Sequence, residues 1–125
     1  MAKVKPLISI VDDDEFMREA LKGLMKSLGH RVEAAASAEE FLRSPHICRT
    51  SCLIADVQMP GMTGLDLHRH LSASGKPIPT ILITAYPDDS VRERAVAAGA
   101  IGYLSKPFDE NGLLACIRSA LTTRP

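Results

Sequence analysis

Several residue types that would direct this chain to particular classes of protein are scarce or missing. The 125 residues include no tryptophan, three phenylalanines and two tyrosines, so the core has to consist mainly of aliphatic side chains. There are only three cysteines, an odd number, which argues against a disulfide framework and fits a reducing cytoplasm. Cys48 and Cys52 lie four residues apart, but no further histidine or cysteine cluster completes a zinc site.

Net charge and long apolar runs are also absent. Fifteen basic and fifteen acidic residues give a formal net charge of zero, whereas nucleic-acid-binding domains normally carry a basic excess. We therefore expect no direct binding of nucleic acid by this domain. No apolar run approaches the length of a membrane span, and the run after Pro6 is too short for a signal peptide. These absences predict a cytoplasmic domain that has no membrane partner.

What the chain does contain is a regular alternation between short apolar runs and segments with helical periodicity. The apolar runs predict four strands, at residues 7–11, 52–55, 80–84 and 100–104, and residues 30–35 can make a further, weaker strand. The remaining segments predict five helices, at residues 16–28, 37–44, 63–73, 90–98 and 109–121. The first helix is expected to carry one apolar stripe, at positions 16, 17, 20, 21, 24, 25 and 28. Capping boxes are expected at residues 37–40 and 90–93.

The alternation favours an α/β fold. Continuously apolar strands separated by amphipathic helices indicate a parallel sheet that is covered on both faces. Right-handed crossovers then favour a doubly wound (βα)5 sandwich. By analogy, five units suit the flavodoxin-like strand order 2-1-3-4-5. We expect one domain over residues 1–125.

Polar residues stand at the carboxyl ends of four predicted strands. Asp12 and Asp13 follow the first strand, Asp56 the third, Thr84 ends the fourth, and Lys106 follows the fifth. In an open parallel sheet these ends meet at one edge, so the five side chains should converge. Three carboxylates at about 4 Å repel one another by roughly 1–4 kcal/mol per pair, which favours a bound cation. Oxygen ligands without histidine or thiolate favour Mg²⁺.

The other two groups suit a phosphoryl ligand. An ammonium group at Lys106 and a hydroxyl at Thr84 could neutralise and hydrogen-bond the oxygens of a tetrahedral phosphoryl group. One carboxylate would then be the nucleophile and form an acyl phosphate. Asp56 is the best candidate, because it stands alone at its strand end and an open loop, residues 57–61, follows it.

Four stretches of the sequence resemble the signature blocks of response-regulator receiver domains from bacterial two-component systems. They are Ile10-Val-Asp-Asp-Asp14, Ala55-Asp-Val-Gln-Met-Pro-Gly-Met-Thr-Gly64, Ile83-Thr-Ala85 and Gly102-Tyr-Leu-Ser-Lys-Pro107. The resemblance spans essentially the whole chain, and FixJ-type transcriptional regulators are the most similar group. It implies a CheY-like signalling domain that catalyses only its own phosphorylation and dephosphorylation.

The resemblance also implies a role for each residue of the predicted site. Asp56 would accept a phosphoryl group from a sensor histidine kinase, and Lys106 would contact that group. Asp13 would bind Mg²⁺ directly, Asp12 through water, and Gln58 through its backbone carbonyl.

Further residues would transmit and tune the signal. Thr84 would be the switch hydroxyl, Tyr103 the aromatic residue that turns inward with it, and a cis peptide would precede Pro107. The surface of the fourth helix, fifth strand and fifth helix would then favour dimerisation or control an output partner, by analogy a transcriptional one. Gln58 and Tyr86 occupy the variable positions that tune dephosphorylation.

Each residue taken alone has a plainer explanation. The acidic run 12–15 could be no more than the acidic first turn that a helix dipole favours. A tyrosine in a strand, such as Tyr103, usually packs in the core or at its rim. His68 and His70, two apart on a helix, make a poor metal pair. We expect the four histidines to face solvent, at positions 30, 46, 68 and 70.

Two other classes of function compete with the signalling hypothesis. One is a binding module whose acceptor site is unused. The other is a small enzyme, either flavin-binding or similar to haloacid-dehalogenase phosphatases. The acidic loop 12–14 would repel a flavin phosphate, and the chain has no room for a phosphatase cap. For the signalling class we expect kinase contacts on the first helix, at Arg18, Glu19 and Lys22.

Overall fold

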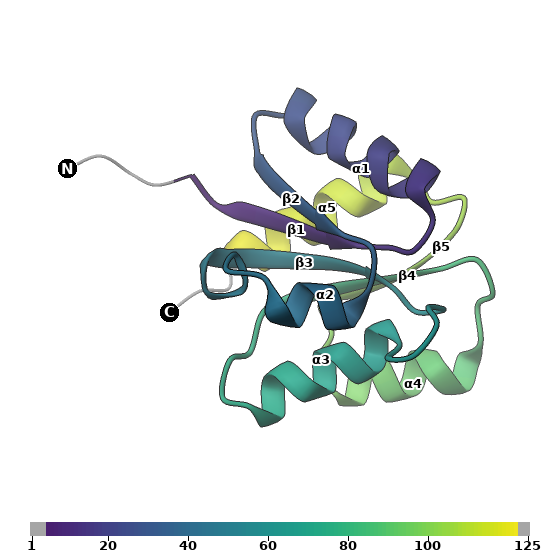
Figure 1. The fold of residues 1–125 in the computed structure, drawn as a ribbon. Coiled ribbons are helices and arrows are strands. Elements are labelled where there is room, and N and C mark those ends of the chain that lie inside the picture. The colour runs from purple at the N-terminus through teal and green to yellow at the C-terminus, as the bar shows by residue number, and fades with distance from the viewer. Residues whose placement is uncertain (1–4, 123–125) are drawn as a thin grey trace.

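The computed structural model describes residues 5–122 and contains one five-stranded parallel sheet (Figure 1). The strands are Leu7–Val11 (β1), Arg31–Ala35 (β2), Thr50–Asp56 (β3), Thr80–Thr84 (β4) and Gly102–Ser105 (β5). Their order is β2-β1-β3-β4-β5, and all neighbouring pairs are parallel. The predicted fold class and strand order are therefore confirmed. The ends of the predicted 1–125 domain, residues 1–4 and 123–125, lie outside the described residues.

Helices cover both faces of the sheet. They are Glu15–Ser27 (α1), Ala38–Arg43 (α2), Gly64–Ala73 (α3), Asp89–Ala97 (α4) and Glu110–Thr122 (α5). A short 3₁₀ helix, Ile47–Arg49 (η1), precedes β3 and was not predicted. Figure 1 shows α1 and α5 on one face, with α2, α3 and α4 on the other. Within residues 5–122, no helix combines the length and apolar character needed to span a bilayer.

The core consists of two aliphatic layers, one on each face of the sheet. Strand side chains alternate between them, so Ile81 and Ile83 of β4 pack beneath α1 and α5 while Leu82 packs beneath the other three helices. Burying each such side chain contributes about 1.5–3 kcal/mol to stability. An aliphatic core was expected from the scarcity of aromatic residues.

The apolar stripe predicted for α1 is only partly buried. Leu21 and Met25 are buried, but Phe16 is 83% exposed and Leu28 is 42% exposed. Phe16 lies in the first turn and Leu28 is the cap residue after the last turn. Both therefore lie at the ends of the helix, outside the part that packs on the sheet.

The start of α4 also differs from the prediction. Asp88 is the N-cap, and its carboxylate accepts hydrogen bonds from the backbone of Ser90 at 2.8 Å and Val91 at 3.3 Å. The capping box predicted at residues 90–93 is wrong, because Asp88 caps the helix two residues before Ser90. Gly99 follows the helix with a φ of 88°, as expected for a helix stop.

The first predicted capping box is only half formed. The Ser37 hydroxyl accepts from the backbone of Glu40 at 3.0 Å. The Glu40 carboxylate, however, accepts from Ala36 at 3.4 Å. A complete capping box starts α3 instead, where Thr63 and Asp66 each accept from the other's backbone, at 3.1 and 3.2 Å.

One of the histidines expected to face solvent is buried near the amino ends of the strands. His68 of α3 is 4% exposed. Its Nδ1 lies 3.1 Å from the Thr80 hydroxyl, and its Nε2 donates to the Ala98 carbonyl at 2.8 Å. The expectation for His68 was wrong because the residue lies three positions from both Leu65 and Leu71, which places it on the buried face of the helix.

Candidate functional site

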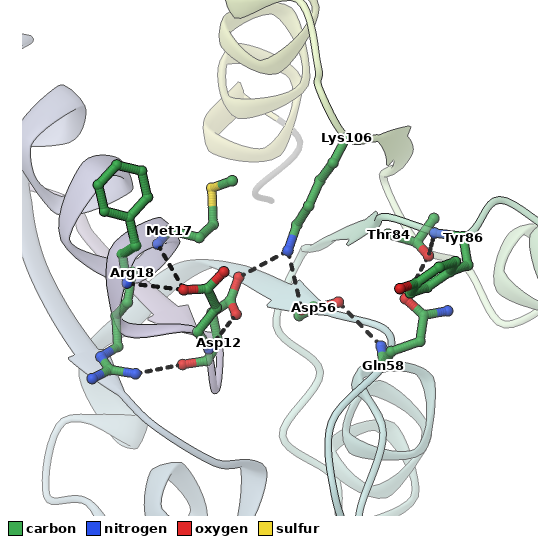
Figure 2. Close-up of polar contacts among 10 residues, drawn as sticks. Asp12, Met17, Arg18, Asp56, Gln58, Thr84, Tyr86 and Lys106 are labelled. Carbon is green, nitrogen blue, oxygen red and sulfur yellow. Dashed lines mark hydrogen bonds and ion pairs between the residues drawn. The ribbon is translucent and has the colours of Figure 1, made fainter.

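The parallel sheet brings the predicted site residues to its carboxyl edge. Asp12 follows β1, Asp56 ends β3, Thr84 ends β4 and Lys106 follows β5. In Figure 2 the Lys106 side chain extends toward Asp12 and Asp56, while Thr84 lies on the far side of Asp56 beside Gln58. The convergence expected from the topology is therefore observed.

Three carboxylates form the centre of the site. Asp12 is 2% exposed and Asp56 is 7% exposed, whereas Asp13 is exposed to solvent. One oxygen from each of the three lies within 4.8 Å of the others. Lys106 Nζ lies 3.3 Å from Asp12 Oδ2 and 3.1 Å from Asp56 Oδ2. A single lysine balances only part of this negative charge, so the cluster suits a hard cation such as Mg²⁺.

Burial and charge act on the two ion-paired groups in different ways. Burial raises the pKa of the Asp12 carboxyl, the Asp14 amide opposes that rise by hydrogen bonding, and the Asp56 charge adds to it. For Lys106, burial acts to lower the pKa, but the hydrogen bond to Asp56 and the charges of Asp12 and Asp56 raise it overall. The ammonium form of Lys106 is thus stabilised by both carboxylates.

The loop after Asp56 is held tightly against the sheet. The backbone amide of Gln58 donates to Asp56 Oδ1 at 3.1 Å, and Gly64 at the start of α3 donates to Val57 at 3.3 Å. A Cβ at Gly64 would lie 2.4 Å from the Asp56 carbonyl oxygen, a distance that no side chain could accept. Glycine is therefore required where α3 meets the end of β3.

The Thr84 hydroxyl is engaged by neighbours other than the carboxylates. Thr84 is fully buried, and its Oγ1 donates to the side-chain carbonyl of Gln58 at 2.5 Å. The same oxygen accepts from the Tyr86 amide at 2.9 Å. Gln58 was predicted to act through its backbone carbonyl and to occupy a tuning position. The side-chain bond to Thr84 was not predicted, because neither periodicity nor spacing in the sequence indicates it.

The two tyrosines near the site have different surroundings. Tyr103 of β5 is partly buried against the α2–α4 layer, and its hydroxyl accepts from the Asp88 amide at 3.2 Å. Tyr86, in the loop before α4, is 72% exposed. The peptide bond between Lys106 and Pro107 is cis, as the resemblance implied.

Arg18, one of the residues expected to contact a kinase, is bound within the domain. Its guanidinium donates to the backbone carbonyl of Asp12 at 2.7 Å, which ties α1 to the end of β1 (Figure 2). The other two, Glu19 and Lys22, pair with each other at 3.7 Å on the helix surface.

Comparison with known proteins agrees with this arrangement. The response regulator receiver domain family matches residues 8–118. The chain is 44% identical over 119 residues to the response regulator protein TmoT of Ectopseudomonas mendocina, covering 95% of this chain and 54% of that protein. It is 35% identical over 114 residues to the transcriptional regulatory protein FixJ of Azorhizobium caulinodans, covering 91% and 54%.

A solved structure gives the same result at the level of the fold. The crystal structure of FixJ-N matches with a TM-score of 0.87 at 30% identity, covering 98% of both chains. The chain spans about half the length of the curated relatives named above. The family match extends over most of the sequence and contains every residue of the carboxyl-edge cluster. The chain therefore belongs to the response regulator receiver domains of two-component systems.

Proposed function

We propose that Asp56 accepts a phosphoryl group from the phosphohistidine of a sensor kinase in a Mg²⁺-dependent reaction. A carboxylate oxygen of Asp56 attacks phosphorus, the phosphorus–nitrogen bond breaks, and the imidazole leaves as the acyl phosphate forms. The observation that carries this proposal is that Asp56 ion-pairs with the Lys106 ammonium at 3.1 Å and forms one cluster with two further carboxylates.

The remaining groups of the site would hold the metal and the phosphoryl oxygens. Asp12, Asp13, Asp56 and the Gln58 backbone carbonyl supply the hard oxygen donors that Mg²⁺ prefers. When bound, the ion would neutralise charge on the transferring group. Lys106 would bind a phosphoryl oxygen in place of its present carboxylate partners.

The signal would then pass from the site to the surface. The Thr84 hydroxyl would move to the phosphoryl group, and Tyr103 would turn inward in the space that Thr84 leaves. The surface of α4, β5 and α5 would change with them and favour dimerisation or an output partner. FixJ of Azorhizobium is named a transcriptional regulatory protein, and by analogy we propose a transcriptional output here.

Two further assignments belong to this proposal. Tyr86 and Gln58 would set the lifetime of the acyl phosphate, Tyr86 by screening it from water. The kinase would contact the exposed part of α1, with Glu19 and Lys22 available and Arg18 partly engaged by Asp12.

The free thiols of Cys48, Cys52 and Cys116 agree with a cytoplasmic setting.

Intact-mass measurement after incubation with acetyl phosphate tests the acceptor chemistry. We expect a gain of one phosphoryl group that requires Mg²⁺, is lost in Asp56→Asn and persists in Asp89→Asn, a matched change at an exposed residue of α4. Label that remained in Asp56→Asn would contradict the acceptor assignment. No gain under any condition would favour a binding module whose acceptor site is unused.

A further inference from the structure

The Thr84 hydroxyl can donate only one hydrogen bond, and Gln58 now receives it. The distance from Thr84 Oγ1 to Gln58 Oε1 is 2.5 Å. The Tyr86 amide donates to Oγ1 at 2.9 Å, so in that contact the hydroxyl oxygen is the acceptor. The single hydroxyl proton is therefore used in the bond to Gln58. Both Gln58 Oε1 and the oxygens of a phosphoryl group act as acceptors toward Thr84. The two cannot use the hydroxyl proton at the same time.

We propose that the Gln58 side-chain amide competes with the phosphoryl group on Asp56 for the Thr84 hydroxyl, and thereby sets how far phosphorylation moves Thr84. This inference rests on the proposed function. It makes Gln58 a positioning residue, acting through Thr84 in addition to any effect on phosphate lifetime.

The backbone of Gln58 is held where this competition requires it. Its amide donates to Asp56 Oδ1 at 3.1 Å, which keeps the residue beside the acceptor while its side chain reaches the end of β4 (Figure 2). The same short segment, residues 56–58, therefore positions two acceptors for the Thr84 hydroxyl proton. One is the side-chain carbonyl of Gln58, and the other would be the phosphoryl group on Asp56.

The exposure of Gln58 makes the bond reversible. Gln58 is exposed to solvent while Thr84 is fully buried. When the hydroxyl turns away, water can hydrate the released amide, so no buried polar group is left unpaired on that side. The contact can therefore oppose the movement of Thr84 without preventing it.

Binding of beryllofluoride with Mg²⁺, followed by amide NMR titration, measures the competition. Gln58→Met keeps the length of the side chain and removes the carbonyl acceptor. Because a neutral hydrogen bond contributes a net free energy of about 1 kcal/mol, Gln58→Met should bind beryllofluoride about three- to tenfold more tightly than wild type. Equal affinity in the two proteins would overturn the inference.

A double-mutant cycle separates this effect from a general change in the loop. In a Thr84→Val background, which removes the hydroxyl at nearly constant volume, Gln58→Met should leave the beryllofluoride affinity unchanged. In a Thr84→Ser background, which keeps the hydroxyl and guards against a folding defect of the valine variant, the tightening should return. A gain that persisted in Thr84→Val, or failed to return in Thr84→Ser, would show that Gln58 does not act through the hydroxyl.

The proposed function and this inference fail in different ways. If wild type bound no beryllofluoride and accepted no phosphoryl group, the acceptor function would be wrong and the competition would fall with it. If wild type bound beryllofluoride and Gln58→Met had no effect, the acceptor function would stand and only the role of Gln58 would be wrong.

Discussion

Polar side chains at the carboxyl ends of the strands (the carboxyl edge) and near their amino ends (the amino edge) have different kinds of partner. At the carboxyl edge, Asp12 and Asp56 share one lysine, and the negative charge exceeds the positive charge. Near the amino edge the buried polar side chains, those of Ser9, His68 and Thr80, hydrogen-bond to partners within the protein. His68 bonds Thr80 and Ala98 there, and the Ser9 and Thr50 hydroxyls lie 2.7 Å apart.

Under the proposed function, this difference separates polar groups that stabilise the domain from those that would bind a ligand. Near the amino edge each buried polar group has its partner within the protein, so removing one leaves the other unpaired. At the carboxyl edge the repulsion between carboxylates stays until a cation binds. The comparison predicts that substitutions at the two edges change stability with opposite signs.

The largest effect is expected near the amino edge, from His68→Ala. The change leaves the Ala98 carbonyl without its donor and opens a cavity, so the free energy of unfolding should fall by about 2–4 kcal/mol. Urea unfolding measures it, with His70→Ala on the exposed side of the same helix as the control. Similar losses in both variants would show that the His68 bonds add no stability.

Mg²⁺ should have the next largest effect, at the carboxyl edge. An ion that binds only the folded state at ten times its dissociation constant raises the free energy of unfolding by about 1.4 kcal/mol. Thermal unfolding with and without Mg²⁺ should show this gain in wild type and a much smaller one in Asp13→Asn. A gain of equal size in Asp13→Asn would remove Asp13 from the metal site.

Without Mg²⁺, Asp13→Asn itself should stabilise the protein slightly. It removes one of three mutually repelling carboxylates, and because Asp13 is exposed the gain should stay below about 1 kcal/mol. Chemical unfolding in the presence of a chelator measures the change, with Asp89→Asn as the control. A loss of stability would mean that the carboxylates at this edge do not repel one another in the folded state.

The smallest effect on stability is expected from Asp88, a carboxylate near the carboxyl edge that lies outside the cluster of three carboxylates. Hydrogen bonds from the Val91 and Ser90 amides lower the pKa of Asp88 below its ordinary value of 3.8. Its folded-state pKa is depressed, so its contribution to stability is present above pH 3.8 and is lost as pH falls through the folded-state pKa.

Asp88→Asn keeps a capping acceptor and removes the titration. The stability difference between wild type and this variant should therefore shrink as pH falls from about 6 to about 3. Urea unfolding across this range measures it. A difference that stayed constant would show that the amides bind the neutral acid as well as the carboxylate.

The most predictable elements were the strands that are continuous apolar runs ending in polar residues. Residues 80–84 were predicted as a strand, and β4 is Thr80–Thr84. Helix starts were less predictable where several capping residues stand close together. Asp88 and Ser90 can each cap a helix, and only the extended backbone at Asp88 shows which one does.

The positions of the site residues followed from topology, but their side-chain partners did not. Parallel strands bring Asp12, Asp56 and Lys106 together in any sheet of this order. The bond between Thr84 and Gln58 depends on side-chain conformations that local packing decides. The burial of His68 could have been predicted from the leucines three residues to either side, because those positions share one helix face.

The lysine bridge at the carboxyl edge also has a consequence for biosynthesis. Lys106 pairs with Asp12 across 94 positions of the sequence and with Asp56 across 50. A chain emerging from the ribosome has all three carboxylates long before it has this lysine. The complete cluster exists only after the last strand has joined the sheet. Nascent or truncated chains therefore lack the complete cluster, and under the proposed function a phosphorylated molecule would be one whose translation and folding have reached the fifth strand.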